Sequence, residues 1–162
     1  MLVFMTTSVF GIQVGEKMKN LPVKDSNDNP ASIPGLGSKV LTVFYTDPDV
    51  KDQNDPFADM LKKENLDKSK YNGVGIANLK DTWKPNSVIR MVVRSKEAKY
   101  NSKIFTDPSY IVKDGWNLGD CDGQSVVIIV DKSGVVKYVK KGALNENERK
   151  EALALIKKLI GS

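Results

Sequence analysis

The stretch that decides the fold is residues 126–139, VVIIVDKSGVVKYV. Its first five residues are the most hydrophobic run in the chain, which is typical of a strand buried on both faces and predicts the central strand of a sheet. The DKSG segment has the composition of a hairpin turn, and the apolar residues after it alternate with Lys137. That alternation indicates a second strand with one face toward water, antiparallel to the first.

A helix is predicted directly after this hairpin. Gly142 ends the second strand, and Asn145 with Glu148 has the spacing of a capping box. Apolar residues then recur on one helical face up to a stop at Gly161. They are Ala152, Leu155, Ile156, Leu159 and Ile160.

Two strand–helix units precede the hairpin. Residues 40–45 (VLTVFY) and 73–79 (GVGIANL) are short apolar runs, each predicted to be a buried strand. The first helix is expected to begin with Asp55 as N-cap and Pro56 in its first turn, and to end near Asn65. The second is expected after Pro85, with an apolar face formed by Val88, Met91 and Val92. Residues 103–106 predict a short extra strand, and the turn-rich residues 24–38 predict a loop.

The order of these elements defines an α/β fold. Two strands joined by a helix should be parallel through a right-handed crossover, whereas the C-terminal hairpin must be antiparallel. The prediction is a mixed four- to five-stranded sheet with helices on both faces.

This order resembles the thioredoxin fold over most of the chain, from Val40 to about Lys158. Residues 103–136 are similar to the branch that contains TlpA-like thiol reductases and peroxiredoxins. The closest likeness is to YtfJ-like periplasmic proteins, which share a Trp–Leu pair, a small residue before an apolar strand, a DK-x-G turn and a "GAL" segment before the last helix. The matching residues are Trp116, Leu118, Ser125, Asp131, Lys132, Gly134, Gly142, Ala143 and Leu144.

The resemblance also implies where an active site would be. Redox-active relatives carry W-C-x-x-C where the first helix begins, and these two cysteine positions correspond here to Asp49 and Asp52. The cis-proline of the family corresponds to Ser125. A carboxylate cannot form a disulfide, and the peroxidatic cysteine of a peroxiredoxin is also absent from this loop. Asp49, Asp52, Gln124 and Ser125 therefore mark the edge where relatives hold extended substrates.

The chain has one cysteine, Cys121, and no histidine. An intrachain disulfide, a CxxC motif and Ser–His or Cys–His catalysis are thereby excluded. Cys121 lies between Asp120 and Asp122, whose negative charges should raise the pKa of its thiol. An incidental free thiol is favoured over a catalytic one.

Four carboxylates stand close together in the first loop: Asp47, Asp49, Asp52 and Asp55. Hard cations prefer several oxygen ligands, so a cation-binding module is an alternative. The EF-hand spacing is absent, however, and a polar turn with a helix N-cap explains the same residues. No metal or other cofactor is expected. Trp83 and Trp116 are expected to pack in the core or at its edge.

The composition limits the possible partners. The 162 residues suit one domain, and 40% hydrophobic with 28% charged residues is ordinary for a globular protein. The net charge is +5, but the lysines are scattered among acids, so nucleic-acid binding is not expected. No apolar run is long enough to span a bilayer.

The N-terminus resembles the apolar end of a secretory signal. Residues 1–12 are interpreted as a signal remnant, with Val9 and Gly11 as small residues near a cleavage point, although the positive n-region is missing. A short strand or buried arm is the alternative. Residues 13–162 would then be a single thioredoxin-like domain, and the expected location is the periplasm or another extracytoplasmic compartment.

Taken together, the sequence favours a redox-inactive thioredoxin-fold protein that binds an unidentified protein or peptide. Two alternatives stay open. One is a thiol oxidoreductase or peroxidase that acts through Cys121, and the other is the cation-binding module of residues 47–55.

Overall fold

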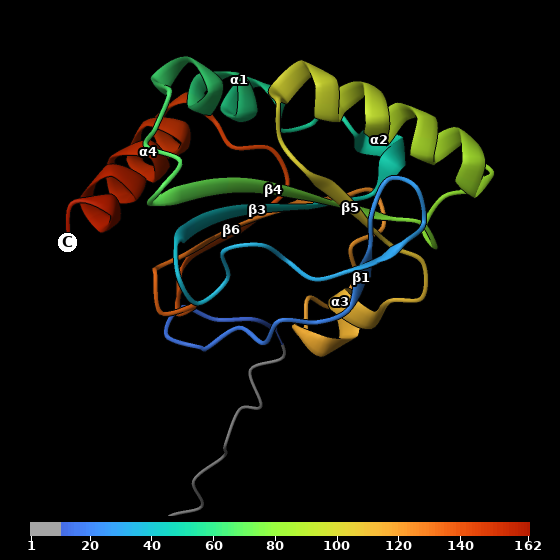
Figure 1. Cartoon of the computed structure of the whole chain (residues 1–162), viewed down its shortest axis with the longest axis horizontal. Helices are drawn as coiled ribbons and strands as arrows, with labels where there is room; N and C mark the ends of the chain where they lie inside the picture. Colours follow the sequence, from blue (N-terminus) through green and yellow to red (C-terminus); the bar gives the residue numbers. More distant parts are fainter. Residues whose placement is uncertain (1–10) are drawn as a thin grey trace, which may run out of the picture.

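The computed structural model describes residues 11–162, which form a seven-stranded mixed sheet and the helices around it (Figure 1). The strand order is β2-β1-β5-β4-β3-β6-β7. The strands are β1 (Val23–Lys24), β2 (Pro30–Ala31), β3 (Val40–Thr46), β4 (Tyr71–Asn78), β5 (Ile104–Asp107), β6 (Ser125–Val130) and β7 (Val136–Lys141). The helices are the 3-10 turn η1 (Pro48–Val50), α1 (Asp55–Glu64), α2 (Asn86–Tyr100), α3 (Ile111–Gly115) and α4 (Glu146–Ile160).

The strand pairing confirms the predicted directions. β3 and β4 are parallel, as are β4 and β5, whereas β6 is antiparallel to both β3 and β7. Two details of the prediction were wrong. The segment expected to be a loop contains β1 and β2, two-residue strands that extend the sheet beyond β5. β6 is also not central, since it lies between β3 and β7; all six of its residues are nevertheless buried, because both faces of the sheet are covered.

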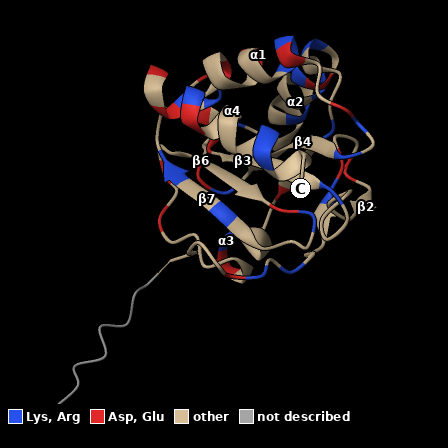
Figure 2. Cartoon of the chain, turned by 90° about the vertical axis from the view of Figure 1, so that its left-hand side faces the viewer, with Lys and Arg blue, Asp and Glu red and all other residues tan. Residues whose placement is uncertain are grey.

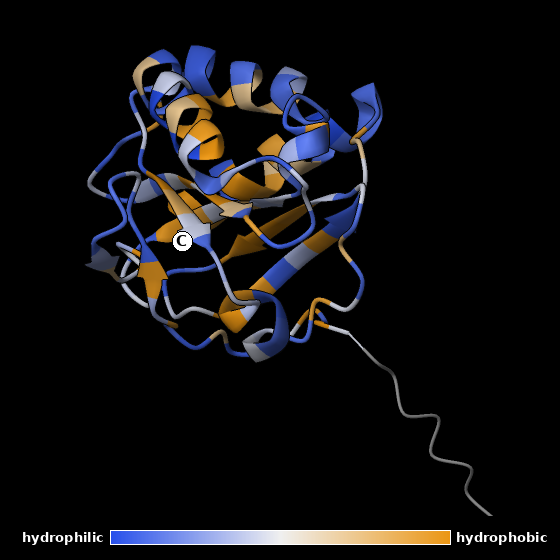
Figure 3. Cartoon of the chain, turned by 90° about the vertical axis from the view of Figure 1, so that its right-hand side faces the viewer, coloured by the Kyte–Doolittle hydropathy of each residue, from blue (hydrophilic) through white to orange (hydrophobic). Residues whose placement is uncertain are grey.

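The two faces of the sheet are covered differently. Helices α1, α2 and α4 lie over one face, and the short α3 with the N-terminal segment lies over the other (Figure 1). Hydrophobic segments of the strands and helices face each other across both interfaces (Figure 3). On the α3 side the buried side chains form one continuous cluster, which includes Tyr45, Ile128 and Trp116.

The ends of two helices were predicted with unequal success. Asn145 caps α4 and forms a complete capping box with Glu148, as expected. The N-cap of α1 is Asn54, not Asp55, which lies in the first turn. The side chain of Asn54 does not cap α1. It donates to the Gly142 carbonyl at 3.1 Å and accepts from the Leu144 N–H at 2.9 Å, so it is used to hold the segment before α4.

The buried face of α2 also differs from the prediction. Ile89 and Val93 point into the core, whereas Val88 and Met91 are 38% and 59% exposed. The four consecutive positions Val88 to Met91 hold three apolar residues, so the pattern fits two helical faces and only the packing of the helix on the sheet selects one.

Charged residues of both signs are interspersed over the helices (Figure 2). The part of the chain that the structure describes contains no helix with the length and hydrophobicity of a membrane span. The proposed signal remnant lies almost wholly outside the described residues; Ile12, at its end, donates its N–H to the Asn117 carbonyl at 3.0 Å.

Candidate functional site

The candidate site lies at the edge of the sheet where the parallel strands β3 and β4 end and β6 begins. Thr46 at the end of β3 pairs with Ser125 at the start of β6. Asp47 follows β3 directly, and the Gly119–Gly123 loop precedes β6. Strand direction thus brings the two loops together, as the thioredoxin resemblance implies.

Asp47 joins these two loops and is almost fully buried, at 1% exposure. One carboxylate oxygen accepts the Asp49 N–H at 2.8 Å, and the other accepts the Gly123 N–H at 2.7 Å. The Asp47 N–H donates to the Gln124 carbonyl at 3.0 Å. This carboxylate is therefore used within the protein to fix the shape of the site.

Asp49 and Asp52, which the resemblance assigned to the cysteine positions of redox-active relatives, are each paired with lysine. The Asp49 carboxylate accepts from Lys84 Nζ at 2.6 Å and from the Thr82 hydroxyl at 3.0 Å. These hydrogen bonds, first that from Lys84, lower the pKa of Asp49. Asp52 pairs with Lys51 at 2.5 Å and with Lys96 at 3.1 Å, and these contacts lower its pKa to about 2.

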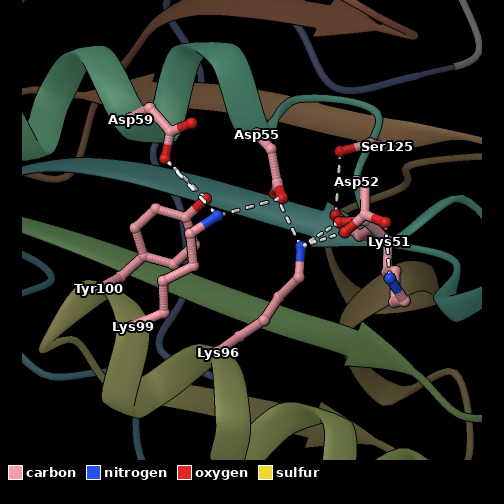
Figure 4. Close-up of polar contacts among 9 residues, drawn as sticks. Lys51, Asp52, Asp55, Asp59, Lys96, Lys99, Tyr100 and Ser125 are labelled. Carbon is pink, nitrogen blue, oxygen red and sulfur yellow. Dashed lines mark hydrogen bonds and ion pairs between the residues drawn. The ribbon is translucent and has the colours of Figure 1, made fainter.

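Asp55, the last carboxylate of the acidic loop, is also paired with lysine (Figure 4). Asp55 lies 2.7 Å from Lys96 Nζ and 3.7 Å from Lys99 Nζ, so α1 and α2 are linked through charged side chains. Within residues 11–162, no group of three or more Asp, Glu, Cys or His side chains is arranged to hold a metal ion. The geometry of the loop is that of a series of ion pairs and does not favour the cation-binding alternative.

Ser125 is buried, and its polar groups are occupied inside the chain. Its N–H donates to the Gln53 side-chain carbonyl at 2.8 Å, and its hydroxyl lies 2.9 Å from that of Thr46. The carbonyl of Gln124 already accepts the Asp47 N–H. No peptide bond between residues 11 and 162 is cis. The backbone groups beside Ser125 are thus satisfied without a substrate strand, and a peptide at this edge would have to be held by side chains.

Cys121 is fully buried below this edge. Its Sγ lies 3.6 Å from the Gly119 carbonyl and 3.9 Å from the Leu118 carbonyl, contacts compatible with a weak S–H donor. Burial raises the pKa of the thiol, and this outweighs the nearby Lys141 and Lys113. The flanking carboxylates that the sequence suggested are only a minor cause.

Two further acidic residues at this edge were missed by the sequence reasoning. Asp107 is buried and accepts the Tyr45 hydroxyl at 2.9 Å, while its oxygens also accept N–H groups at the start of α3. Asp81 accepts the Tyr110 hydroxyl, which raises the pKa of Tyr110 to about 12. For Asp107, the only indication in the sequence was its place before Pro108 in a predicted turn.

The two tryptophans were both expected to pack in the core or at its edge, and this is wrong for Trp83. Trp116 is buried and donates its ring N–H to the Lys19 carbonyl at 2.8 Å, as a core residue should. Trp83, in contrast, is 86% exposed. It lies between Thr82 and Lys84, the two residues that bind Asp49, which the resemblance assigned to the first cysteine position of redox-active relatives.

One protein family matches most of the chain. The model of the family described as "bacterial protein of unknown function (YtfJ_HI0045)" matches residues 17–159. A protein of Haemophilus influenzae is 26% identical over 137 residues, which cover 82% of this chain and 73% of that protein.

Solved structures are similar in fold. A thiol-disulfide isomerase from Corynebacterium glutamicum superposes with a TM-score of 0.68 at 14% identity, covering 91% of this chain and 97% of that one. An exposed lipoprotein thioredoxin from Streptococcus pneumoniae gives 0.65 at 12% identity, covering 87% of this chain and 100% of that one. The chain therefore belongs to the YtfJ family and has a thioredoxin-like fold.

Proposed function

We propose that this chain is a binding module of the bacterial cell envelope, which uses a thioredoxin-like fold to hold a protein or peptide without thiol chemistry. The observation that carries the proposal is Trp83, an indole 86% exposed at the edge where thioredoxin relatives hold their substrates. Tryptophan is enriched among the residues that dominate protein–protein binding energy.

The absence of a usable thiol at this edge supports the same conclusion. Asp49 and Asp52 cannot act as redox nucleophiles, and Cys121 is buried with a raised pKa. A catalytic cysteine normally lies in a partly exposed, electropositive environment that lowers its pKa. Cys121 has the opposite environment, so the alternative of an oxidoreductase acting through this residue is not favoured.

The ion pairs around Asp49 would serve to position Trp83. Thr82 and Lys84 are both anchored to the Asp49 carboxylate, and this restrains the backbone on either side of the indole. A pre-positioned aromatic side chain loses little conformational entropy on binding. The envelope location is part of the proposal and rests on the apolar N-terminal stretch of the sequence.

A photo-crosslinking amino acid placed at position 83 tests the proposal in bacterial cells. We expect discrete crosslinked species that mass spectrometry identifies as one or a few envelope proteins, and weaker crosslinking when Asp49→Ala removes the anchor. Position 14 is the matched control, because Val14 is 63% exposed and lies at the opposite edge of the sheet. The next residue, Gly15, donates its N–H to the Val136 carbonyl at the start of β7. Identical crosslinks from both positions, or efficient reduction of insulin disulfides by the purified chain, would refute the proposal.

A further inference from the structure

A cavity of about 560 Å³ lies between the α1–α2 helices and the sheet. Its walls come from β3, β4, β5, α1 and α2, and Thr46 and Ser125 of the candidate site line it as well. Small-molecule sites in proteins have volumes of about 300–1,000 Å³. The cavity is thus large enough for a ligand and reaches the functional edge.

The sequence of β4 creates this space. On the helix side of the strand, Gly73, Gly75 and Ala77 present almost no side chain, whereas Val74 and Ile76 on the other side are fully buried. Gly73 does not have the left-handed backbone that requires glycine, and an added Cβ would meet nothing closer than the Tyr71 hydroxyl at 3.7 Å. Glycine inside a strand often marks a place where a ligand approaches the backbone. Neither backbone strain nor crowding explains glycine at position 73.

The cavity also divides the core under the helices. Leu61 and Tyr71 belong to a cluster formed with α4, whereas Ile89, Val93 and Leu79 form a separate small cluster under α2. Leu61, Tyr71, Ile89 and Val93 all line the cavity. The two halves of the helical layer therefore fail to pack together at the place where the cavity lies.

Polar contacts bridge α1 and α2 in place of apolar ones (Figure 4). Besides the Lys96 and Lys99 pairs described above, Tyr100 donates its hydroxyl to Asp59 at 3.1 Å, and Lys62 Nζ donates to the Lys99 carbonyl at 2.6 Å. Partly exposed ion pairs contribute little free energy. These contacts can rearrange to admit a ligand at low cost.

The chemistry of the walls selects the ligand. The hydroxyls that line the cavity are bonded within the protein: Tyr71 to Thr42, Ser102 to the Gly73 carbonyl, and Thr46 with Ser125. A ligand body that needs hydroxyl partners would find them occupied, whereas an aliphatic chain would bury the apolar walls. The amides of Asn65, Asn72 and Asn101 also line the cavity. Five lysines and a single carboxylate, Asp55, line the cavity. The lysines are Lys51, Lys62, Lys68, Lys96 and Lys103. Lys51 and Lys96 are paired with Asp52 and Asp55, so the positive charge available to a ligand comes from Lys62, Lys68 and Lys103.

We propose that this cavity binds an amphiphile with an aliphatic chain and one carboxylate head group, its chain between β4 and the two helices and its head near the lysines. The cavity reaches the candidate site through Thr46 and Ser125, but Trp83 does not line it. The proposal therefore does not depend on the function proposed for Trp83.

Titration of the purified chain with sodium decanoate, followed by backbone NMR, tests the proposal. We expect saturable one-to-one binding, with shift changes concentrated at Gly73, Gly75, Ile89 and Val93. Decyltrimethylammonium has a chain of equal length and the opposite charge, so it should bind more weakly. No saturation with decanoate, or equal binding of the cation, would overturn the proposal. Binding to phosphatidylcholine vesicles but not to decanoate would also overturn it.

Variants give an independent test. Gly73→Leu fills the cavity and should weaken decanoate binding at least about tenfold, without lowering the melting temperature. Ala77→Leu provides the same test if Gly73→Leu does not fold. Lys103→Glu should weaken binding about two- to fivefold. Lys63→Glu, an exposed position of α1 outside the cavity, is its control. Wild-type affinity in both filled variants would show that the ligand binds elsewhere.

Discussion

The buried carboxylate of Asp47 is the residue on which the shape of the candidate site depends most. It accepts backbone N–H groups from both loops. The Asp49 side chain, two residues further on, is 36% exposed and pairs with Lys84. Charge-assisted bonds in a buried setting stabilise far more than exposed ion pairs. The two aspartates should therefore respond differently to the same substitution.

Asp47→Ala is expected to lower the free energy of unfolding by about 2–4 kcal/mol, because two backbone donors lose a charged acceptor. Asp49→Ala is its matched control and should cost about 0–1 kcal/mol. Urea unfolding of both variants checks this difference. Equal costs would mean that Asp47 does not hold the two loops together.

Asp52 predicts a specific pH dependence of stability. Lys51 and Lys96 lower its pKa from the usual 3.8 to about 2 in the folded chain. A lowered pKa in the folded state means that the stabilisation is fully present above pH 3.8 and is lost as the pH falls toward 2. The contribution is small, under about 1 kcal/mol, because the side chain is 59% exposed. Urea unfolding of wild type and Asp52→Asn should differ at pH 6 and converge near pH 2; a difference that is constant with pH would contradict this.

At the scale of the elements, the sequence predicted a helix N-cap correctly where only one residue near the helix start could serve as the cap. The capping box of Asn145 and Glu148 was predicted, and the structure contains both of its hydrogen bonds. Asp55, in contrast, stands beside Asn54, and both residue types cap helices well. The choice between them depends on Gly142 and Leu144, which lie about ninety residues away and use the Asn54 side chain.

Asn145→Ala should lower the free energy of unfolding by about 1 kcal/mol, through loss of the cap of α4. Asn147→Ala is the control, since residue 147 is exposed in the same helix and should change stability by less than about 0.5 kcal/mol. Thermal unfolding measures both variants. Alanine is a better helix former than asparagine, so a similar loss in the two would show that the Asn145 cap is not what stabilises α4.

At the scale of the whole molecule, the sequence was sufficient for the order of elements and their directions. The hydrophobic run of β6, the turn after it and the crossovers defined a mixed sheet that the structure confirms. The position of Trp83 could not be predicted in this way. An isolated tryptophan is normally buried, and only the tertiary contacts of its neighbours with Asp49 place it at the surface.

The cavity also arises only at this scale. Residues 73–79 were predicted to be a strand, but the missing side chain of Gly73 becomes a cavity only when α1 and α2 lie above it. Over Gly75 the Ile104 side chain fills the space. The ion pairs between α1 and α2 likewise join residues about forty positions apart. No periodicity within one element contains this information.

The central claim is that this thioredoxin-like chain has no redox nucleophile, and the rate at which Cys121 reacts with a small thiol-specific reagent, measured against pH, tests it most directly. We expect the folded chain to react slowly, with an apparent pKa above that of an ordinary thiol, because burial disfavours the thiolate. The same thiol should react at once when guanidinium unfolds the chain. Fast reaction of the folded chain, with an apparent pKa well below that of a free cysteine, would contradict the account and restore a thiol-dependent enzyme.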